Sequence, residues 1–219
     1  MNLAPKHRQM TSVTRRRALA AAIPLVAFLS TGTAAQGIQS QPVEVHEGTA
    51  TFDASTNLPA IRIHGKSEAL QGRARIRKNA DGLVIERLEA VLPVWTLKTG
   101  LALRDEHMRK YVFTTPDGKV PDMRFVAEGG VCSGAGGGAQ TCKVSGDLFI
   151  RDIPRPFSIV LKVSDNGTLL RAAGDGVVRL STYAISPPSQ LGVRTMDAVK
   201  LHMDFAVRRV EEQIARDSR

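Results

Sequence analysis

Apolar and polar residues alternate with a period of two along most of the chain. The alternation is plainest over residues 143–151, 157–163 and 199–207, where an apolar side chain occupies every second position. This period places successive side chains on opposite faces of a half-buried β-strand. The sequence therefore predicts about eight strands, at residues 61–64, 73–77, 83–92, 123–128, 143–151, 157–163, 169–180 and 199–207.

Turn signals separate these strands, and helices do not alternate with them. Asp165-Asn166-Gly167 is one such signal. Before the C-terminal tail, only residues 104–111 have a helical pattern, which predicts one short helix. Antiparallel strands joined by turns form either a sandwich or a closed barrel, and the alternation alone leaves both open. Eight strands close readily around one small ligand.

The N-terminal residues 1–35 have the three regions of a secretory signal peptide. Arginines at 15–17 are followed by an apolar stretch at residues 18–29 and by small residues at 32–35. A permanent anchor is less favoured, because a membrane-spanning helix needs about 20 apolar residues. We expect a periplasmic or secreted protein with a flexible lead-in at residues 36–47, a domain at 48–210 and a tail at 211–219.

Removal of this signal lowers the net charge considerably. The full chain carries +9, and the predicted signal contains five basic residues and no acidic ones, which leaves +4. Acidic residues are mixed with the basic ones that remain. Binding to nucleic acid requires a concentrated basic surface, so we exclude nucleic acid as a partner.

The chain has two cysteines, Cys132 and Cys142. In an exported protein they are expected to form a disulfide. The segment between them is rich in glycine but lacks the flanking strand, helix and Lys-Ser/Thr of a phosphate-binding loop. We interpret it as the disulfide-closed tip of a hairpin.

Candidate catalytic and metal-binding residues are few. The histidines after the signal, at positions 46, 64, 107 and 202, have no metal-ligand spacing, so we predict no metal site. Glu106 and His107 lie in a charged cluster that could hold a general base. A solvated, salt-bridged helix face is the favoured interpretation of that cluster, and we predict no catalytic residue.

A basic stripe follows one strand face at Arg73, Arg75, Arg77 and Lys78. It could contact an anionic head group or a membrane surface. An ordinary solvated outer face is favoured, because strand alternation places these side chains opposite the core.

Three blocks of sequence resemble the YceI-like family. They are RDEHMR at residues 104–109, PDMRF at 121–125 and KVSGDLFIRDIPRPF at 143–157, and residues 199–207 are similar to the family's closing strand. The resemblance covers residues 83–207, with a looser match over 48–76. The glycine-rich cysteine loop and residues 181–188 depart from the family pattern, and both lie at or between strand ends.

The resemblance implies an exported, lipocalin-like, eight-stranded antiparallel barrel that holds a polyisoprenoid lipid, such as a quinone or polyprenyl carrier, in its lumen. No cofactor is then required beyond this lipid, and a transient contact with a membrane surface and a homodimer are further expectations. A periplasmic enzyme that uses Glu106 and His107 and a filled barrel that serves as an interaction module are the alternatives. Strand parity gives the predicted lumen residues, which are Phe125, Leu148, Ile150, Phe157, Ile159, Leu161, Leu201, Met203 and Phe205.

Overall fold

The computed structural model describes residues 40–79, 82–134 and 138–210. All of them belong to one compact unit of the chain, Gln36–Arg219. The predicted signal peptide at residues 1–35 and the predicted tail at 211–219 lie outside the described residues. Among the described helices, none has the length and apolar character needed to cross a membrane.

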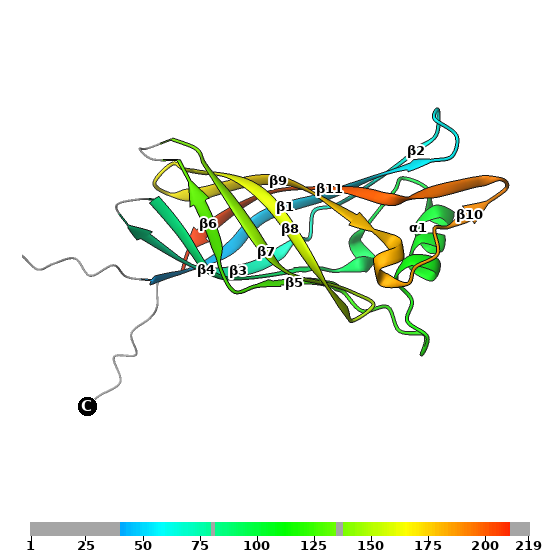
Figure 1. Ribbon diagram of the computed structural model, residues 1–219, viewed down its shortest axis with the longest axis horizontal. Helices are drawn as coiled ribbons and strands as arrows, with labels where there is room; N and C mark the ends of the chain where they lie inside the picture. The colour runs from blue at the N-terminus through cyan, green and yellow to red at the C-terminus, as the bar shows by residue number, and fades with distance from the viewer. Residues whose placement is uncertain (1–39, 80–81, 135–137, 211–219) are drawn as a thin grey trace, which may run out of the picture. The chain divides into compact units, whose positions relative to one another are not determined.

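The described residues form a closed antiparallel β-barrel (Figure 1). Strands β1 and β11 pair with each other and close it, and every pair of named strands is antiparallel. The barrel has eight strand positions. Strands β2 and β3 both pair with the same side of β1, and β5 and β6 both lie between β4 and β7. The short strand β10 pairs only with the first residues of β11 and adds no position. This confirms the predicted barrel over the sandwich. The strands are β1 (Ser40–Thr56), β2 (Arg62–Ser67), β3 (Gln71–Asn79), β4 (Gly82–Leu92), β5 (Met123–Ala127), β6 (Gly130–Ser133), β7 (Gln140–Ile150), β8 (Ile153–Asp165), β9 (Leu169–Arg179), β10 (Ser189–Gln190) and β11 (Val193–Arg209).

The prediction of a flexible lead-in at residues 36–47 is wrong for residues 40–47, since β1 begins at Ser40. Two features hide this strand in the sequence. A register shift between Val45 and Glu47 interrupts the alternation, and the buried residues that follow include the small side chains of Ala50 and Ala54. The predicted number of eight still equals the number of positions in the barrel. The reason is that two of the predicted segments, β2 and β3, share one position.

The strand parity predicted from the sequence matches the burial of the side chains. In β8, Phe157, Ile159 and Leu161 are buried, whereas the intervening Ser158, Val160 and Lys162 are exposed. In β11, the alternating apolar side chains of Val199, Leu201, Met203, Phe205 and Val207 are only partly buried. These partly buried side chains face the interior space described below.

Two glycines let neighbouring groups of the barrel wall pack closely. A Cβ atom on Gly146 of β7 would lie 2.1 Å from the backbone oxygen of Val126 in the neighbouring strand. A Cβ atom on Gly176 of β9 would lie 2.4 Å from Cζ of Phe157. Glycine thus allows the close approach of the Val126 backbone at Gly146 and of the Phe157 ring at Gly176.

The short helix predicted at residues 104–111 is present. It is α1 (Ala102–Met108), which continues into the π-helical turn η2 (Arg109–Phe113), and the 3₁₀ turns η1 (Val94–Thr96) and η3 (Leu180–Tyr183) are the other helical segments described. Arg151, in the turn after β7, donates from Nε to the backbone oxygen of Val112 at 2.9 Å and so ties η2 to the barrel. Figure 1 shows α1 at the same end of the barrel as β2 and β10, opposite the end that carries β6.

Candidate ligand-binding cavity

The barrel encloses a cavity of about 660 Å³. This volume lies within the range of roughly 300–1,000 Å³ that is typical of sites for small organic ligands. A cavity of this size contradicts the alternative of a filled barrel. All nine predicted lumen residues line it: Phe125, Leu148, Ile150, Phe157, Ile159, Leu161, Leu201, Met203 and Phe205.

The wall of the cavity is mainly apolar, with an aromatic pair on one side. The rings of Phe125 and Phe157 meet edge to face, with their centroids 5.7 Å apart. Sequence reasoning missed the contribution of β1, of which Ala50, Phe52 and Ala54 also line the cavity. Their alternation was the available signal, but it is short and consists mostly of alanine.

The cavity meets solvent at the end of the barrel that carries α1. Ile61, Tyr111 and Leu191 line the cavity and are also exposed, so they mark its opening, which we call the mouth. Ile61 follows β1, Tyr111 lies in η2, and Leu191 is in the turn between β10 and β11.

Hydrogen bonds join the three segments around the mouth. Asn57 donates from Nδ2 to the backbone oxygen of Gly192 at 3.0 Å and accepts at Oδ1 from the backbone nitrogen of Arg194 at 2.7 Å. Nδ1 of His107 in α1 lies 3.0 Å from Oε1 of Gln190 in β10. The turn after β1, the β10–β11 hairpin and α1 are therefore connected to one another.

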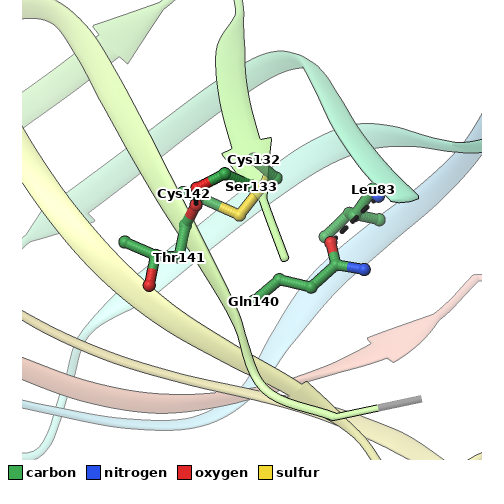
Figure 2. Close-up of a disulfide and its surroundings, with 6 residues drawn as sticks. All are labelled: Leu83, Cys132, Ser133, Gln140, Thr141 and Cys142. Carbon is green, nitrogen blue, oxygen red and sulfur yellow. Dashed lines mark hydrogen bonds between the residues drawn. A yellow bond between two sulfur atoms is a disulfide. The ribbon is translucent and has the colours of Figure 1, made fainter. Parts of the chain in front are cut away.

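The opposite end of the barrel is held by a disulfide and by charged side chains. Cys132 of β6 and Cys142 of β7 are paired across the strands, which confirms the predicted disulfide (Figure 2). In the same view, Oε1 of Gln140 accepts a hydrogen bond from the backbone nitrogen of Leu83 at 3.0 Å. Asp165 accepts hydrogen bonds from Lys78 and from Arg209. The bond from Lys78 contributes most to lowering the pKa of Asp165.

A buried carboxylate fixes the start of α1. Asp105 accepts hydrogen bonds from the backbone nitrogen of Thr99 at 2.7 Å and from its hydroxyl at 2.6 Å. Burial by itself would raise the pKa of Asp105, but the two hydrogen bonds from Thr99, helped by the charges of Lys98 and Arg109, outweigh burial and lower this pKa. Asp105 is therefore a structural anion at neutral pH.

The residues expected of a general base are not assembled as a pair. His107 lines the cavity, and its hydrogen-bond partner is Gln190. Glu106 is exposed and is absent from the cavity wall. Among the residues that the structure describes, no three His, Cys, Asp or Glu side chains are grouped closely enough to hold a metal ion.

The arginines of the basic stripe of β3 follow the outward parity of the strand, and three of its four basic residues form ion pairs. Arg73 pairs with Glu89 at 2.8 Å, and Arg77 pairs with Glu86 at 2.9 Å. Lys78 pairs with Asp165. The positive charge of the basic stripe is thus largely compensated, as expected for a solvated outer face.

Comparisons with known proteins agree with this architecture. A family model described as the YceI-like domain matches residues 41–207. A polyisoprenoid-binding domain from Saccharophagus degradans, implicated in plant cell wall breakdown, is 13% identical with a TM-score of 0.58, and the match covers 77% of this chain and 98% of that one. BcnA from Burkholderia cenocepacia is 16% identical with a TM-score of 0.56, over 73% of this chain and 95% of that one. No curated protein matches.

Proposed function

This chain belongs to the YceI-like family, and on that premise we propose that it binds one long apolar lipid with an isoprenoid-type tail in its barrel. The observation that carries this proposal is the apolar cavity of about 660 Å³ with an open mouth. The similar barrel from Saccharophagus degradans is described as a polyisoprenoid-binding domain, which supports a ligand of this class. Storage or transport of the lipid, without catalysis, is the role we assign.

Burial of the tail accounts for the affinity. Each methylene removed from water contributes about 0.8 kcal/mol, so a five-carbon isoprenoid unit contributes up to roughly 3–4 kcal/mol before ordering costs. The described lining offers the tail inner faces from nearly all barrel strands. A few units in the cavity would therefore give tight binding, and the polar residues at the mouth would meet the head group.

Catalysis is the less supported alternative. An enzyme acting through Glu106 and His107 requires the carboxylate to orient the imidazole, whereas His107 interacts with Gln190. If turnover of an apolar substrate were found and were lost in folded His107→Ala protein, the hypothesis of an enzyme would replace that of a lipid-binding protein.

We place this function in the periplasm or outside the cell. The disulfide between Cys132 and Cys142 supports an oxidising compartment. The predicted homodimer stays a prediction, which light scattering of the purified protein would check.

Two adjacent residues of β8 provide a matched test of lipid binding. Leu161 is buried and lines the cavity, whereas Lys162 is exposed on the outer face. Leu161→Lys places a charge among the apolar tail atoms and is expected to remove most of the bound lipid, and Lys162→Glu is expected to leave it unchanged.

Lipid occupancy should be measured by mass spectrometry of organic extracts, after circular dichroism and thermal melting have shown both variants to be folded. Full occupancy in folded Leu161→Lys would contradict the proposed binding site. Loss of lipid only in Lys162→Glu would show that the outer face carries the ligand.

A further inference from the structure

One charged side chain of the cavity wall has a buried donor without a partner. Arg104 of α1 lines the cavity, and its Nη2 donates to the backbone oxygen of Thr99 at 2.5 Å. Its Nε is buried and has no hydrogen-bond partner among the described residues. No carboxylate in the described part of the chain forms an ion pair with Arg104, although Asp105 is its neighbour in sequence.

Such an arrangement is costly for the protein alone. A guanidinium stays charged at any physiological pH, and a buried donor without a partner destabilises the fold, more so when the group is charged. Asp105 does not relieve this cost, because it forms no ion pair with Arg104 and accepts its hydrogen bonds from Thr99. An acceptor supplied by a ligand in the cavity would relieve it.

We propose that Arg104 forms a head-group subsite that binds an acceptor oxygen, preferably an anionic one, at the polar end of the ligand. This inference rests on the proposed lipid binding and adds the ligand's orientation to it. The head group lies at the mouth against Arg104, with Thr99 and His107 beside it in the cavity wall, and the tail extends toward the disulfide end. An amphiphile with a cationic amine at its end is disfavoured.

Three probes with the same saturated chain test this subsite: hexadecanoate, hexadecanol and hexadecylamine. Calorimetry on the wild type should show tightest binding for the carboxylate and weakest for the amine. Arg104→Met should weaken carboxylate binding on the order of tenfold and leave the alcohol nearly unchanged, and Arg104→Lys should restore part of the preference. Arg194→Met removes an exposed arginine at the same end and is expected to change nothing.

The outcomes separate the subsite from the proposed function. Equal affinity of the wild type for all three probes, or an unchanged carboxylate preference in folded Arg104→Met, would overturn the subsite and leave lipid binding intact. Failure of the wild type to bind any of the probes, together with failure to bind a quinone or polyprenyl analogue, would overturn both.

A separate observation concerns the surface around the mouth. Large apolar side chains are exposed on all three segments that meet there, and Leu191 at the tip of the β10–β11 hairpin is 98% exposed. We call this set the apolar rim, and it consists of Leu58, Ile61, Trp95, Leu101, Leu103, Tyr111 and Leu191.

Leu191 is also unfavourable for the hairpin itself. Its φ is +50°, in the left-handed region where glycine and asparagine are favoured, and Gly192 follows with φ of +79°. A leucine at this position gains no burial within the chain and strains the turn. The stability of the fold therefore does not explain the leucine at this position.

The charge of the same surface indicates its partner. Residues 57–68, 94–111 and 188–196 contain seven basic and three acidic residues. Apolar side chains surrounded by excess positive charge are complementary to an anionic lipid bilayer. We infer that the apolar rim docks on an anionic membrane surface and turns the mouth toward the bilayer.

Leu191→Asn provides an informative test, because its expected effects on stability and on docking are opposite. Asparagine suits the left-handed turn, so the melting temperature should be unchanged or higher. Co-sedimentation with phosphatidylcholine vesicles that contain phosphatidylglycerol should fall several-fold. Val131→Asn, at the 78% exposed valine of β6 at the other end of the barrel, is the control and should sediment as the wild type does.

Two results would overturn docking through the apolar rim. One is wild-type protein that does not sediment with these vesicles at low salt. The other is unchanged sedimentation of Leu191→Asn.

Discussion

Asp105 shows how one buried carboxylate positions the helix at the mouth. Helix α1 has seven residues, and helices this short are not stable alone in water. Asp105 links it to Thr99 through two hydrogen bonds, while Arg151 holds the turn that follows it. The placement of Arg104 and His107 in the cavity wall thus depends on contacts that neither residue makes itself.

We expect Asp105→Asn to lower the free energy of unfolding by about 1–3 kcal/mol at neutral pH, because hydrogen bonds to a charged acceptor are replaced by weaker ones. The folded-state pKa of Asp105 is lowered, so its contribution is fully present above the unfolded pKa of about 4. It is lost as the pH falls through the lower folded-state pKa.

Urea unfolding at neutral and at acidic pH measures this effect. The difference between the wild type and Asp105→Asn should shrink in acid, while Glu106→Gln, at an exposed neighbour, should show little difference at either pH. A difference that stays constant with pH would show that the charge of Asp105 is not what stabilises α1.

At the scale of elements, the β6–β7 hairpin is fixed by its disulfide. The bond closes a sequence separation of 10 residues, and Cys142 is fully buried. The double variant Cys132→Ala with Cys142→Ala is expected to lose about 2–3 kcal/mol of folding stability in denaturant titrations. Lipid occupancy should persist, since neither cysteine lines the cavity. Loss of bound lipid from the folded double variant would show that this hairpin shapes the cavity.

The elements differ in how far the sequence predicts them. Strands β7, β8 and β11 alternate clearly in the sequence over residues 143–151, 157–163 and 199–207, so their inner residues could be named in advance. Strand β1 was missed because its bulge shifts the alternation, and β6 and β10 because they have only four and two residues. The pairing of β1 with β11 is a long-range contact that the local pattern does not reveal.

The candidate site also has a part that the sequence predicts and a part that it does not. The nine predicted lining residues follow from strand parity, which is a local property of the sequence. The mouth could not be predicted, because it depends on contacts such as that between His107 and Gln190, which are 83 residues apart. The unpartnered Nε of Arg104 is likewise visible only once α1 has been placed against the barrel.

At the scale of the whole barrel, the two ends differ in character. One is tied by the disulfide and by the ion pairs of Asp165. The other carries α1, β2 and the β10–β11 hairpin (Figure 1), and exposed side chains line the cavity there. The polar side chains of Thr99, Arg104 and His107 line an otherwise mainly apolar cavity, an arrangement that suits an amphiphile. Under the proposed function, burial of the tail sets the affinity and these polar side chains select the head group.

The most direct measurement is mass spectrometry of an organic extract from the wild-type protein purified from its native host, quantified against protein concentration. We predict a long-chain isoprenoid or quinone-type lipid in near-equimolar amount, retained in Lys162→Glu and largely lost in Leu161→Lys. Wild-type protein that carries no such lipid, and that binds no quinone or polyprenyl analogue when one is supplied, would contradict the proposed function.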